Sequence, residues 1–511
     1  MPEEERPWLE RLRALPWQRF GAGVVAGTAG LALAFLLRML GLGIFLPELA
    51  VDFAVRVIPG SVESFFIRTM GGGAKALALA VALLVFLALP GLYAISYRRL
   101  EARVRNRWIV LALYTFGSAG ISLLLIVPIL GGGFLGAGTS AGPALASFSQ
   151  LASAWLYAAV LDYFLVDVAA RHPDGFSPSR RRFLMTATAA VAGAAIAFYG
   201  LSATVGRPAR LFFASVAEMF AKELTPTEEF YVVTKNVIDP AVDAASWRLE
   251  VDGLVSGPKS HAYGDLASRA DAEEFVTLEC VSNEVGGNLI STAKWSGIRL
   301  ADLLVEAGVD PRADWVAFTC ADGYTVGVPL AKAMDPGSLL VLRMNELPLS
   351  AKHGAPARIV VPGLYGMFHA KWITRITLVQ GEFRGFWQQR GWTNEGMTRT
   401  TAIIATPRPD SVITSGVALA GIAFAGDRGI SRVEVSTDGG STWAPAVLKG
   451  AALSATTWIL WTYDFDPPTG GAYRIVVRAV DGLGQAQEAS PSAPFPRGSA
   501  GYDTITLLVS R

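Results

Sequence analysis

The stretch LECVSNEVGGNLISTAKWSG, residues 278–297, places Cys280 at the end of the apolar run FVTL, with Glu279 between them, and ahead of polar residues and a glycine pair. Cys280 is one of only two cysteines among 511 residues. A lone thiol at this place is either a small core residue or a soft ligand for a metal. The second cysteine, Cys320, leaves one disulfide between the two open, because spacing alone does not exclude it. Two cysteines are too few for a disulfide framework or a four-thiolate metal site.

The composition indicates a chain of several domains with an apolar end. Of the residues, 52% are hydrophobic and 17% are charged, against roughly 25% charged in typical soluble domains. A length of 511 residues exceeds what one hydrophobic core usually holds. The net charge is +1, and no basic tract with interleaved aromatic residues follows residue 205, so no nucleic-acid partner is expected.

Five stretches before residue 205 are long and apolar enough to cross a membrane. They are residues 20–46, 73–97, 108–130, 149–170 and 183–203. The alternative, buried core helices, does not explain why arginines gather in alternate connecting loops while the loop at 131–150 carries no charge. Residues 51–70, which contain Pro59, are expected to be interfacial or re-entrant rather than a sixth span.

The loop charges predict the orientation of these five spans. Under the positive-inside rule the N-terminus lies in the cytoplasm. Everything after residue 205 then lies on the periplasmic, outer face of a bacterial cytoplasmic membrane. The fourth loop ends in SRRRFL, residues 179–184, which resembles a twin-arginine export signal, a route that carries domains folded around a cofactor.

Three ionisable residues, Arg38, Asp162 and Asp167, lie in or near these spans, where charges usually face a partner. Arg38 pairing with Asp162 is one hypothesis, and snorkelling of both side chains to the interface is the other. No histidine lies inside a predicted span, so the spans cannot supply both axial ligands of a bis-histidine haem.

After residue 205 the sequence predicts an α+β domain over 206–400 and an all-β domain over 401–511. Alternating or branched runs predict strands at 247–254, 357–363 and 372–379, and RLADLLVEAG predicts a helix that ends at Gly308. The C-terminal part reads as short strands and turns, with a hairpin around 438–440, and predicts an immunoglobulin-like sandwich. Residues 436–443 also fit an Asp-box hairpin, which staples a fold and is no catalytic site.

Polar residues of 206–400 recur in loops beside the predicted strands, where functional sites usually lie. One thiolate suffices for a metal whose other ligands come from an organic cofactor, and a phosphate on that cofactor would need Arg, Lys and His donors. Cys320 is expected in the core, His261 on the surface, and Glu279 and Glu284 in structural roles.

Over residues 215–511 the ordered motifs resemble the sulfite oxidase family of molybdopterin enzymes and its C-terminal dimerisation domain. Cys280 matches the cysteine that ligates molybdenum, in a similar context with Asn283. His353 and Arg358 match the His-Gly-x-Pro-x-Arg motif whose side chains hold the pterin and its phosphate. The further cofactor-binding positions implied by the resemblance are Lys235, Asn236, Asp322, Gly366, His369, Ala370 and Lys371, of which Lys235 is also expected on the substrate side.

The sequence also departs from the family pattern. The arginine that sulfite oxidases carry five residues after the metal cysteine is Val285 here, and the Arg-Asn-His motif reads Lys235, Asn236 and Val237. Specificity for sulfite therefore stays open. A second branch of the family, a periplasmic reductase of methionine sulfoxide, also lacks those arginines, although it normally lacks the sandwich domain.

The resemblance implies a membrane-anchored oxidoreductase that transfers an oxygen atom at a molybdenum held by one dithiolene and Cys280. The expected substrate is a small sulfur oxyanion or a sulfoxide. With no haem or iron–sulfur motif in the sequence, electrons are expected to pass to a separate cytochrome or quinone system. A homodimer is expected from the dimerisation-type domain. The alternative from another class is a cofactor-free membrane interaction protein.

Overall fold

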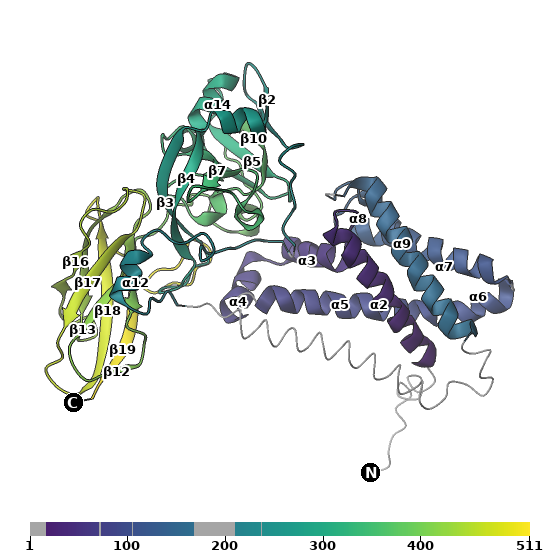
Figure 1. Cartoon of the computed structure of the whole chain (residues 1–511), viewed down its shortest axis with the longest axis horizontal. Helices are drawn as coiled ribbons and strands as arrows, with labels where there is room; N and C mark the ends of the chain where they lie inside the picture. The colour runs from purple at the N-terminus through teal and green to yellow at the C-terminus, as the bar shows by residue number, and fades with distance from the viewer. Residues whose placement is uncertain are drawn as a thin grey trace, which may run out of the picture. The chain divides into compact units, whose positions relative to one another are not determined.

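The computed structural model describes residues 17–70, 73–104, 106–139, 141–167, 210–236 and 238–510. The chain divides into two compact units (Figure 1). The first covers Met1–Val57, Met70–Arg207 and Lys235–Ile238, and the second covers Ile58–Thr69, Pro208–Thr234 and Asp239–Arg511.

The described part of the first unit is helical. Its main helices are α2 (Trp17–Met39), α3 (Leu46–Val57), α5 (Gly73–Ala94), α6 (Tyr97–Val104), α7 (Arg107–Ile121) and α9 (Gly142–Asp162). Shorter helical segments follow two of these helices. After α7 come η1 (Ser122–Ile126), α8 (Val127–Ile129) and η2 (Phe134–Gly136), and after α9 comes η3 (Tyr163–Asp167). Small residues let these helices approach closely: a Cβ on Gly23 of α2 would lie 2.5 Å from the Ala94 Cβ of α5, and a Cβ on Gly30 would lie 2.9 Å from the Ser153 carbonyl oxygen of α9.

Four of the five predicted spans correspond to apolar helices long enough to cross a membrane. These are Arg19–Met39, Leu77–Val104, Arg107–Ile129 and Gly142–Leu165. The first ends at Met39 rather than at residue 46, where the chain turns instead into α3. The fifth predicted span, 183–203, and the twin-arginine-like motif, 179–184, lie outside the described residues.

The segment 51–70 contains no membrane-length helix. It holds the end of the 12-residue α3 and then the 11-residue α4 (Gly60–Met70), with Pro59 between them. Both are short against the roughly 20 residues that a span needs. Residues 58–69, most of α4, belong to the second unit.

The hypothesis that Arg38 pairs with Asp162 is wrong. Arg38 makes a two-pronged ion pair with Glu48 of α3, with Nε 2.8 Å from Oε2 and one terminal nitrogen 2.9 Å from Oε1. Asp162 is buried and accepts hydrogen bonds from the Tyr97 hydroxyl and, at 2.6 Å, from Nε of Arg107. The arrangement of the helices therefore gives each of these two charges its own partner.

The α+β part of the second unit holds two sheets. The first has the order β2-β1-β10-β5-β6 and the second β3-β4-β7-β8, with β9 added on β7. The strands are β1 (Arg248–Gly253), β2 (Lys259–Ala262), β3 (Ala272–Glu279), β4 (Ile290–Arg299), β5 (Trp315–Cys320), β6 (Thr325–Pro329), β7 (Leu339–Met344), β8 (Leu347–Pro348), β9 (Arg358–Val360) and β10 (Ile373–Val379). Branched residues face inward along them, so Leu249 and Val251 of β1 and Ile376 and Leu378 of β10 share one buried core.

Short helices complete this part and confirm the predicted elements. They are α12 (Val216–Ala221), α13 (Tyr263–Ser268), α14 (Leu300–Ala307) and α15 (Leu330–Ala333). The predicted helix is α14, and it ends at Gly308 in the left-handed conformation, with φ of +73°. The three predicted strands correspond to β1, β9 and β10.

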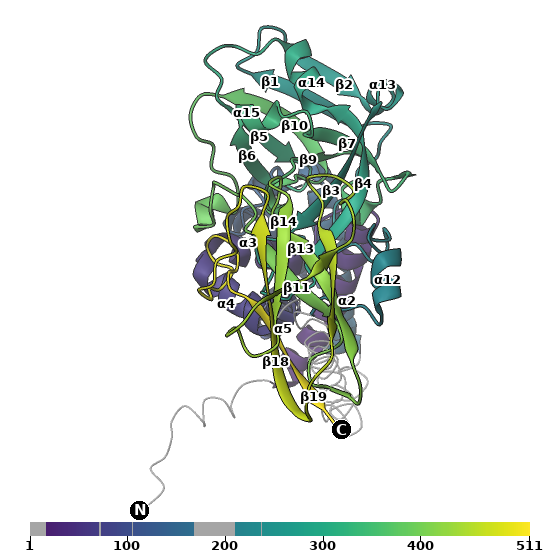
Figure 2. The same cartoon turned by 90° about the vertical axis from the view of Figure 1, so that its left-hand side faces the viewer.

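The C-terminal part consists of two sheets that pack around one core (Figure 2). Their orders are β11-β13-β17-β16 and β12-β19-β18-β14-β15. The strands are β11 (Thr401–Thr406), β12 (Ser411–Ile413), β13 (Val417–Phe424), β14 (Ile430–Ser436), β15 (Ala444–Pro445), β16 (Val447–Leu448), β17 (Ile459–Phe465), β18 (Gly471–Asp481) and β19 (Asp503–Val509). The predicted hairpin is β14–β15, and Asp438 closes its turn by accepting from the amides of Ser441 and Thr442 at 2.9 Å.

Candidate active site

Cys280 lies where β3 ends and a tight loop begins. Its amide donates to the Leu289 carbonyl at 2.9 Å, and its own carbonyl accepts from the Asn283 amide at 2.9 Å. The side chain is buried, with Sγ 3.0 Å from the Ser282 hydroxyl. Burial raises the pKa of the Cys280 thiol, against the hydrogen bonds from Ser282. A thiol held in this way ionises readily only when a metal compensates its charge.

Asn283 ties this loop together. Its Nδ2 donates to Glu279 at 3.0 Å, and its Oδ1 accepts from the Leu289 amide at 3.0 Å. Burial raises the pKa of Glu279 to about 7, against the hydrogen bond from Asn283. Glu279 therefore fits the structural role predicted for it, and the amide of Asn283, a predicted cofactor contact, holds the cysteine loop in shape.

Arg358 of β9 is a buried cation without a carboxylate partner among the described residues. Its terminal nitrogens donate to the carbonyls of His353 at 3.1 Å and His369 at 3.4 Å, and its carbon lies 4.9 Å from the centroid of the Trp295 ring. Its Nε is buried with no hydrogen-bond partner, and burial lowers the pKa of the guanidinium to about 10. A buried charge of this kind is expected to meet an anion, so the site suits the phosphate of a cofactor.

The two predicted histidines behave differently. His353 places Nε2 3.0 Å from the Thr227 carbonyl, and burial lowers its pKa to about 4. At neutral pH the ring is therefore uncharged, with Nε2 donating and Nδ1 left as an acceptor. His369 uses both nitrogens inside the protein: Nδ1 accepts from the Val361 amide at 3.1 Å, and Nε2 lies 3.0 Å from the Leu364 carbonyl. The ring of His369 thus fixes its loop.

Gly366 provides a cradle beside Cys280. A Cβ there would lie 2.5 Å from the Tyr231 hydroxyl, 3.3 Å from the Glu279 carbonyl oxygen and 3.6 Å from the Cys280 Cα. A side chain at this position would collide with the Tyr231 hydroxyl, so the glycine lets its loop pack against the cysteine loop. Tyr231 was not predicted as a site residue, and only its place near the predicted 235–236 motif could have indicated it.

The remaining predicted residues line the same region. Lys371 donates from Nζ to the Lys352 carbonyl at 3.2 Å and lies 4.4 Å from the Trp372 ring centroid. Ala370 is buried and its carbonyl accepts from the Ile359 amide at 2.8 Å. Asp322 accepts from the Tyr324 amide at 3.0 Å, and the Tyr324 hydroxyl donates to the Met367 carbonyl at 2.7 Å. The loops at 322, 353–358 and 366–371 therefore meet next to Cys280.

Lys235 and Asn236 are placed in the first unit, where Lys235 donates to the Asn236 side chain at 2.8 Å. Their membership of the site stays a prediction. Cys280 and Cys320 are both free thiols, so the disulfide left open by the sequence is absent. His261 was predicted on the surface and is instead buried, because it lies on β2 opposite Leu249 of the core strand β1.

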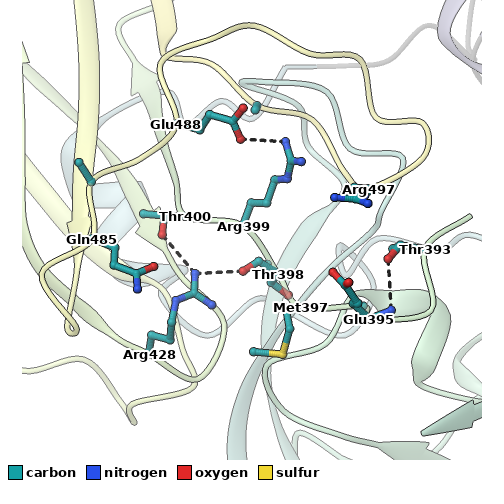
Figure 3. A pocket seen from close by; sticks show the side chains of 13 residues that line it. Thr393, Glu395, Met397, Thr398, Arg399, Thr400, Arg428, Gln485, Glu488 and Arg497 are labelled. Atoms are coloured by element: carbon teal, nitrogen blue, oxygen red, sulfur yellow. Dashed lines mark hydrogen bonds and ion pairs between the residues drawn. The ribbon is translucent and has the colours of Figure 1, made fainter.

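A pocket of about 320 Å³ lies between the α+β part and the C-terminal sheets. Its charged lining residues are Glu395, Arg399, Arg428, Glu488 and Arg497. Figure 3 shows the three arginines bordering one hollow. Arg428 pairs with Asp481 at 2.8 Å and Arg399 with Glu488 at 3.2 Å, whereas no carboxylate of the described chain pairs with the exposed Arg497. Sequence reasoning missed these arginines, which have no motif of their own.

Tyr365 connects this pocket to the cysteine. Its hydroxyl accepts from the Arg399 amide at 3.2 Å, and a Cβ on Gly498 would lie 2.1 Å from the same oxygen. The next residue, Gly366, abuts Cys280. One residue therefore separates the pocket wall from the predicted metal ligand.

Two domain families match the chain after residue 235. The oxidoreductase molybdopterin-binding domain matches residues 236–387, and the Mo-co oxidoreductase dimerisation domain matches residues 395–493. Mitochondrial sulfite oxidase of Homo sapiens is 34% identical over 308 residues, which cover 50% of this chain and 56% of that protein. Sulfite oxidase of Gallus gallus is 31% identical over 317 residues, covering 52% of this chain and 68% of that protein.

The solved sulfane dehydrogenase SoxCD of Paracoccus pantotrophus resembles the chain with 24% identity and a TM-score of 0.47, over 54% of this chain and 81% of that one. The chain spans little more than half the length of the mammalian relatives that it matches. The two domain matches and the sulfite oxidase relatives contradict the alternative of a cofactor-free interaction protein. The chain belongs to the sulfite oxidase family and is a molybdopterin-dependent oxidoreductase.

Proposed function

We propose that this protein is a membrane-anchored enzyme that transfers an oxygen atom to or from a small sulfur oxyanion and exchanges electrons with a separate redox partner. The observation that carries the proposal is the buried Arg358, which has no anionic partner among the described residues and lies beside the contact between Gly366 and Cys280. A phosphate-bearing pterin that brings a metal to a thiolate satisfies both features.

The residues that would hold the molybdenum–molybdopterin cofactor share one face of the α+β part. Arg358, His353 and Lys371 would hold the phosphate and pterin, with the backbone of Gly366 and Ala370 beside them and Asp322 and Asn283 at the edges. Cys280 would ligate the metal, and Lys235 and Asn236 would close the site as the family resemblance implies. When bound, this group supplies the oxygen-atom transfer and the accompanying two-electron change.

The chain's own residues prepare the site for that chemistry. Cys280 and Trp295 are buried and Tyr231 beside them is half-buried, which would keep water from the cofactor side. The Glu279 carboxyl, with a pKa raised to about 7 by burial, carries a proton for much of the time at neutral pH. Its negative charge is therefore partly removed next to the thiolate, where two like charges would repel.

The substrate class depends on where fixed positive charge lies. Val285, at the position of the family's arginine, is half-buried and contributes none. Arg497 and Arg399 offer guanidinium groups in the pocket behind Tyr365, and forked donors of this kind suit oxyanions. These two arginines support a sulfur oxyanion as the substrate, although the sequence had not indicated them as the source of positive charge.

A second candidate is a reductase of methionine sulfoxide or a related oxide on the same scaffold. The uncharged side chain of Val285 in the cysteine loop favours it, because a neutral sulfoxide needs no cation there.

The proposed location is the bacterial cytoplasmic membrane, with five spans, the N-terminus inside and the catalytic part on the periplasmic face. The four apolar helices support membrane anchoring, and the arginine-rich loops in the sequence support the orientation. The matching dimerisation domain supports a homodimer. A cytochrome or the quinone pool is the expected electron partner.

The test uses the full-length protein in detergent. Molybdenum and pterin contents are measured first, and turnover is then assayed with sulfite and a one-electron acceptor, and with methionine sulfoxide and a one-electron donor. Turnover of sulfite alone supports the first candidate, and turnover of the sulfoxide alone supports the second. The variant Cys280→Ser is the control, and it should keep the fold and lose turnover. Normal turnover in that variant would refute Cys280 as the metal ligand.

A further inference from the structure

The cysteine loop is held from outside by a segment far away in the sequence. Arg210 forms an isolated antiparallel bridge with Gly287, and the Leu211 amide donates to the Gly286 carbonyl at 3.0 Å. The Phe213 amide continues along β11 by donating to the Ala405 carbonyl at 3.0 Å. Residues 210–213 therefore lie between the tip of the loop and the C-terminal sheets.

The Arg210 guanidinium lies directly against the loop tip. A Cβ on Gly286 would lie 2.5 Å from one of its terminal nitrogens and 2.8 Å from Oδ1 of Asp503. Gly286 also has a φ of +75°, in the left-handed region that residues with a side chain rarely adopt. The glycine is thus required both by its conformation and by the ion pair that covers it.

That ion pair is anchored in the C-terminal sheets. Arg210 pairs with Asp503 of β19 and also donates to the Ile404 carbonyl of β11 at 3.0 Å. Asp503 is buried and accepts from the Ile404 amide at 2.8 Å. Both groups of the pair are therefore fixed by strands of two different sheets, and the loop tip rests against a rigid surface.

The loop transmits this contact to Cys280 because hydrogen bonds close it at its base and across its middle. The bond between the Cys280 amide and the Leu289 carbonyl closes its base. The Asn283 side chain joins Glu279 to Leu289 across it. A shift at Gly286 and Gly287 would therefore move residues 282–285 and the thiol together.

We propose that Arg210 is a positioning residue that sets the place of the cysteine loop from the C-terminal sheets. The proposal rests on the proposed role of Cys280 as metal ligand. It assigns a role in the site's geometry to a residue outside every cofactor motif, and it makes the C-terminal sheets part of the support of the metal site.

The experiment compares Arg210→Ala and Arg210→Lys with Lys449→Ala in the full-length protein. Lys449 is the matched control, because it pairs with Glu223 and so also joins the segment after residue 210 to the C-terminal sheets, without touching the loop. Three quantities are measured: molybdenum content, the electron paramagnetic resonance signal of the half-reduced metal, and amide hydrogen exchange of residues 281–289 in cofactor-free protein.

Arg210→Ala should keep the molybdenum content but shift the resonance signal and speed amide exchange in the loop. It should also lower kcat about tenfold, with a smaller change in KM. Arg210→Lys, which keeps the charge and loses the fork, should recover part of each effect, and Lys449→Ala should show none. An unchanged signal and unchanged loop exchange in Arg210→Ala would overturn the proposal, as would equal effects in Lys449→Ala. If the parent protein holds no molybdenum, the proposed function fails, while faster loop exchange in Arg210→Ala would still show the contact.

Discussion

Gly366 packs against Cys280, and a Cβ on the glycine would lie in van der Waals contact with the cysteine, 3.6 Å from its Cα. The same Cβ would meet the Tyr231 hydroxyl at 2.5 Å, so three residues far apart in the sequence share one contact. Cys280 follows β3, Gly366 follows β9, and Tyr231 precedes both sheets. The cysteine alone could not reveal the site in the sequence, because the site is formed together with residues such as Gly366 and Tyr231 that lie far from it in the chain.

Gly366→Ala should therefore disturb the metal site without unfolding the protein. The methyl group must displace the Tyr231 hydroxyl or the cysteine loop, and we expect molybdenum content or kcat to fall about tenfold to a hundredfold. Metal analysis and steady-state turnover measure this. The double variant Gly366→Ala with Tyr231→Phe should recover part of the loss, because it removes the oxygen at 2.5 Å. A double variant as poor as the single one would show that the clash with Tyr231 is not the cause.

Arg358→Met should separate cofactor binding from stability. Among the described residues the buried guanidinium has only carbonyl and ring partners, so its removal should leave the cofactor-free protein as stable as the parent, or more stable. Pterin and molybdenum contents should fall at least tenfold. Thermal unfolding of cofactor-free protein and pterin analysis check the two parts.

Arg428→Met is the matched control for Arg358→Met. Arg428 is also a largely buried arginine, but it pairs with the buried Asp481 at 2.8 Å. Its removal leaves that carboxylate unpaired and should cost about 3–5 kcal/mol of stability. Equal destabilisation by both substitutions would contradict the view that Arg358 binds an anion that is not part of the protein.

Sequence patterns predicted local structure well where one residue type decides it. The alternating run at 247–254, the helix that ends at Gly308 and the turn at Asp438 all formed as predicted. Each is fixed by near neighbours in the chain, through side-chain alternation, a left-handed glycine or an aspartate that caps its own turn.

Contacts between distant segments were not predictable in the same way. Nothing near Arg38 in the sequence distinguishes Glu48 from Asp162 as its partner, because the choice depends on how α3 folds back beside α2. His261 looked exposed in a polar stretch, but the antiparallel register with Leu249 turns it inward. The arginines of the pocket come from segments around 399, 428 and 497 that only the packing of the two parts brings together.

Glu279 should make the stability of the cofactor-free protein depend on pH, and Glu279→Gln should remove this dependence. Its folded pKa is raised to about 7 from 4.5, so the stability it contributes is present at low pH and is lost as pH rises through 7. The shift corresponds to roughly 3 kcal/mol. Parent and variant should unfold at similar temperatures near pH 5, and the variant should be the more stable one at pH 8. The buried histidines, which act in the opposite direction, are unchanged between the two proteins, so the comparison isolates Glu279.

The ion pair between Arg38 and Glu48 should be visible as an energetic coupling within the first unit. The side chains are 18% and 9% exposed and are joined by two hydrogen bonds, so removal of one partner leaves the other charge largely buried. Arg38→Ala and Glu48→Gln should each destabilise the protein in detergent, by about 3 kcal/mol for the first. The double variant should lose less than the sum of the two single losses, with a coupling of roughly 1–3 kcal/mol.

Arg38→Ala combined with Asp162→Asn should instead be additive, because Asp162 is bound by Tyr97 and Arg107 and shares no partner with Arg38. Coupling in the second cycle and additivity in the first would restore the pairing that the sequence suggested.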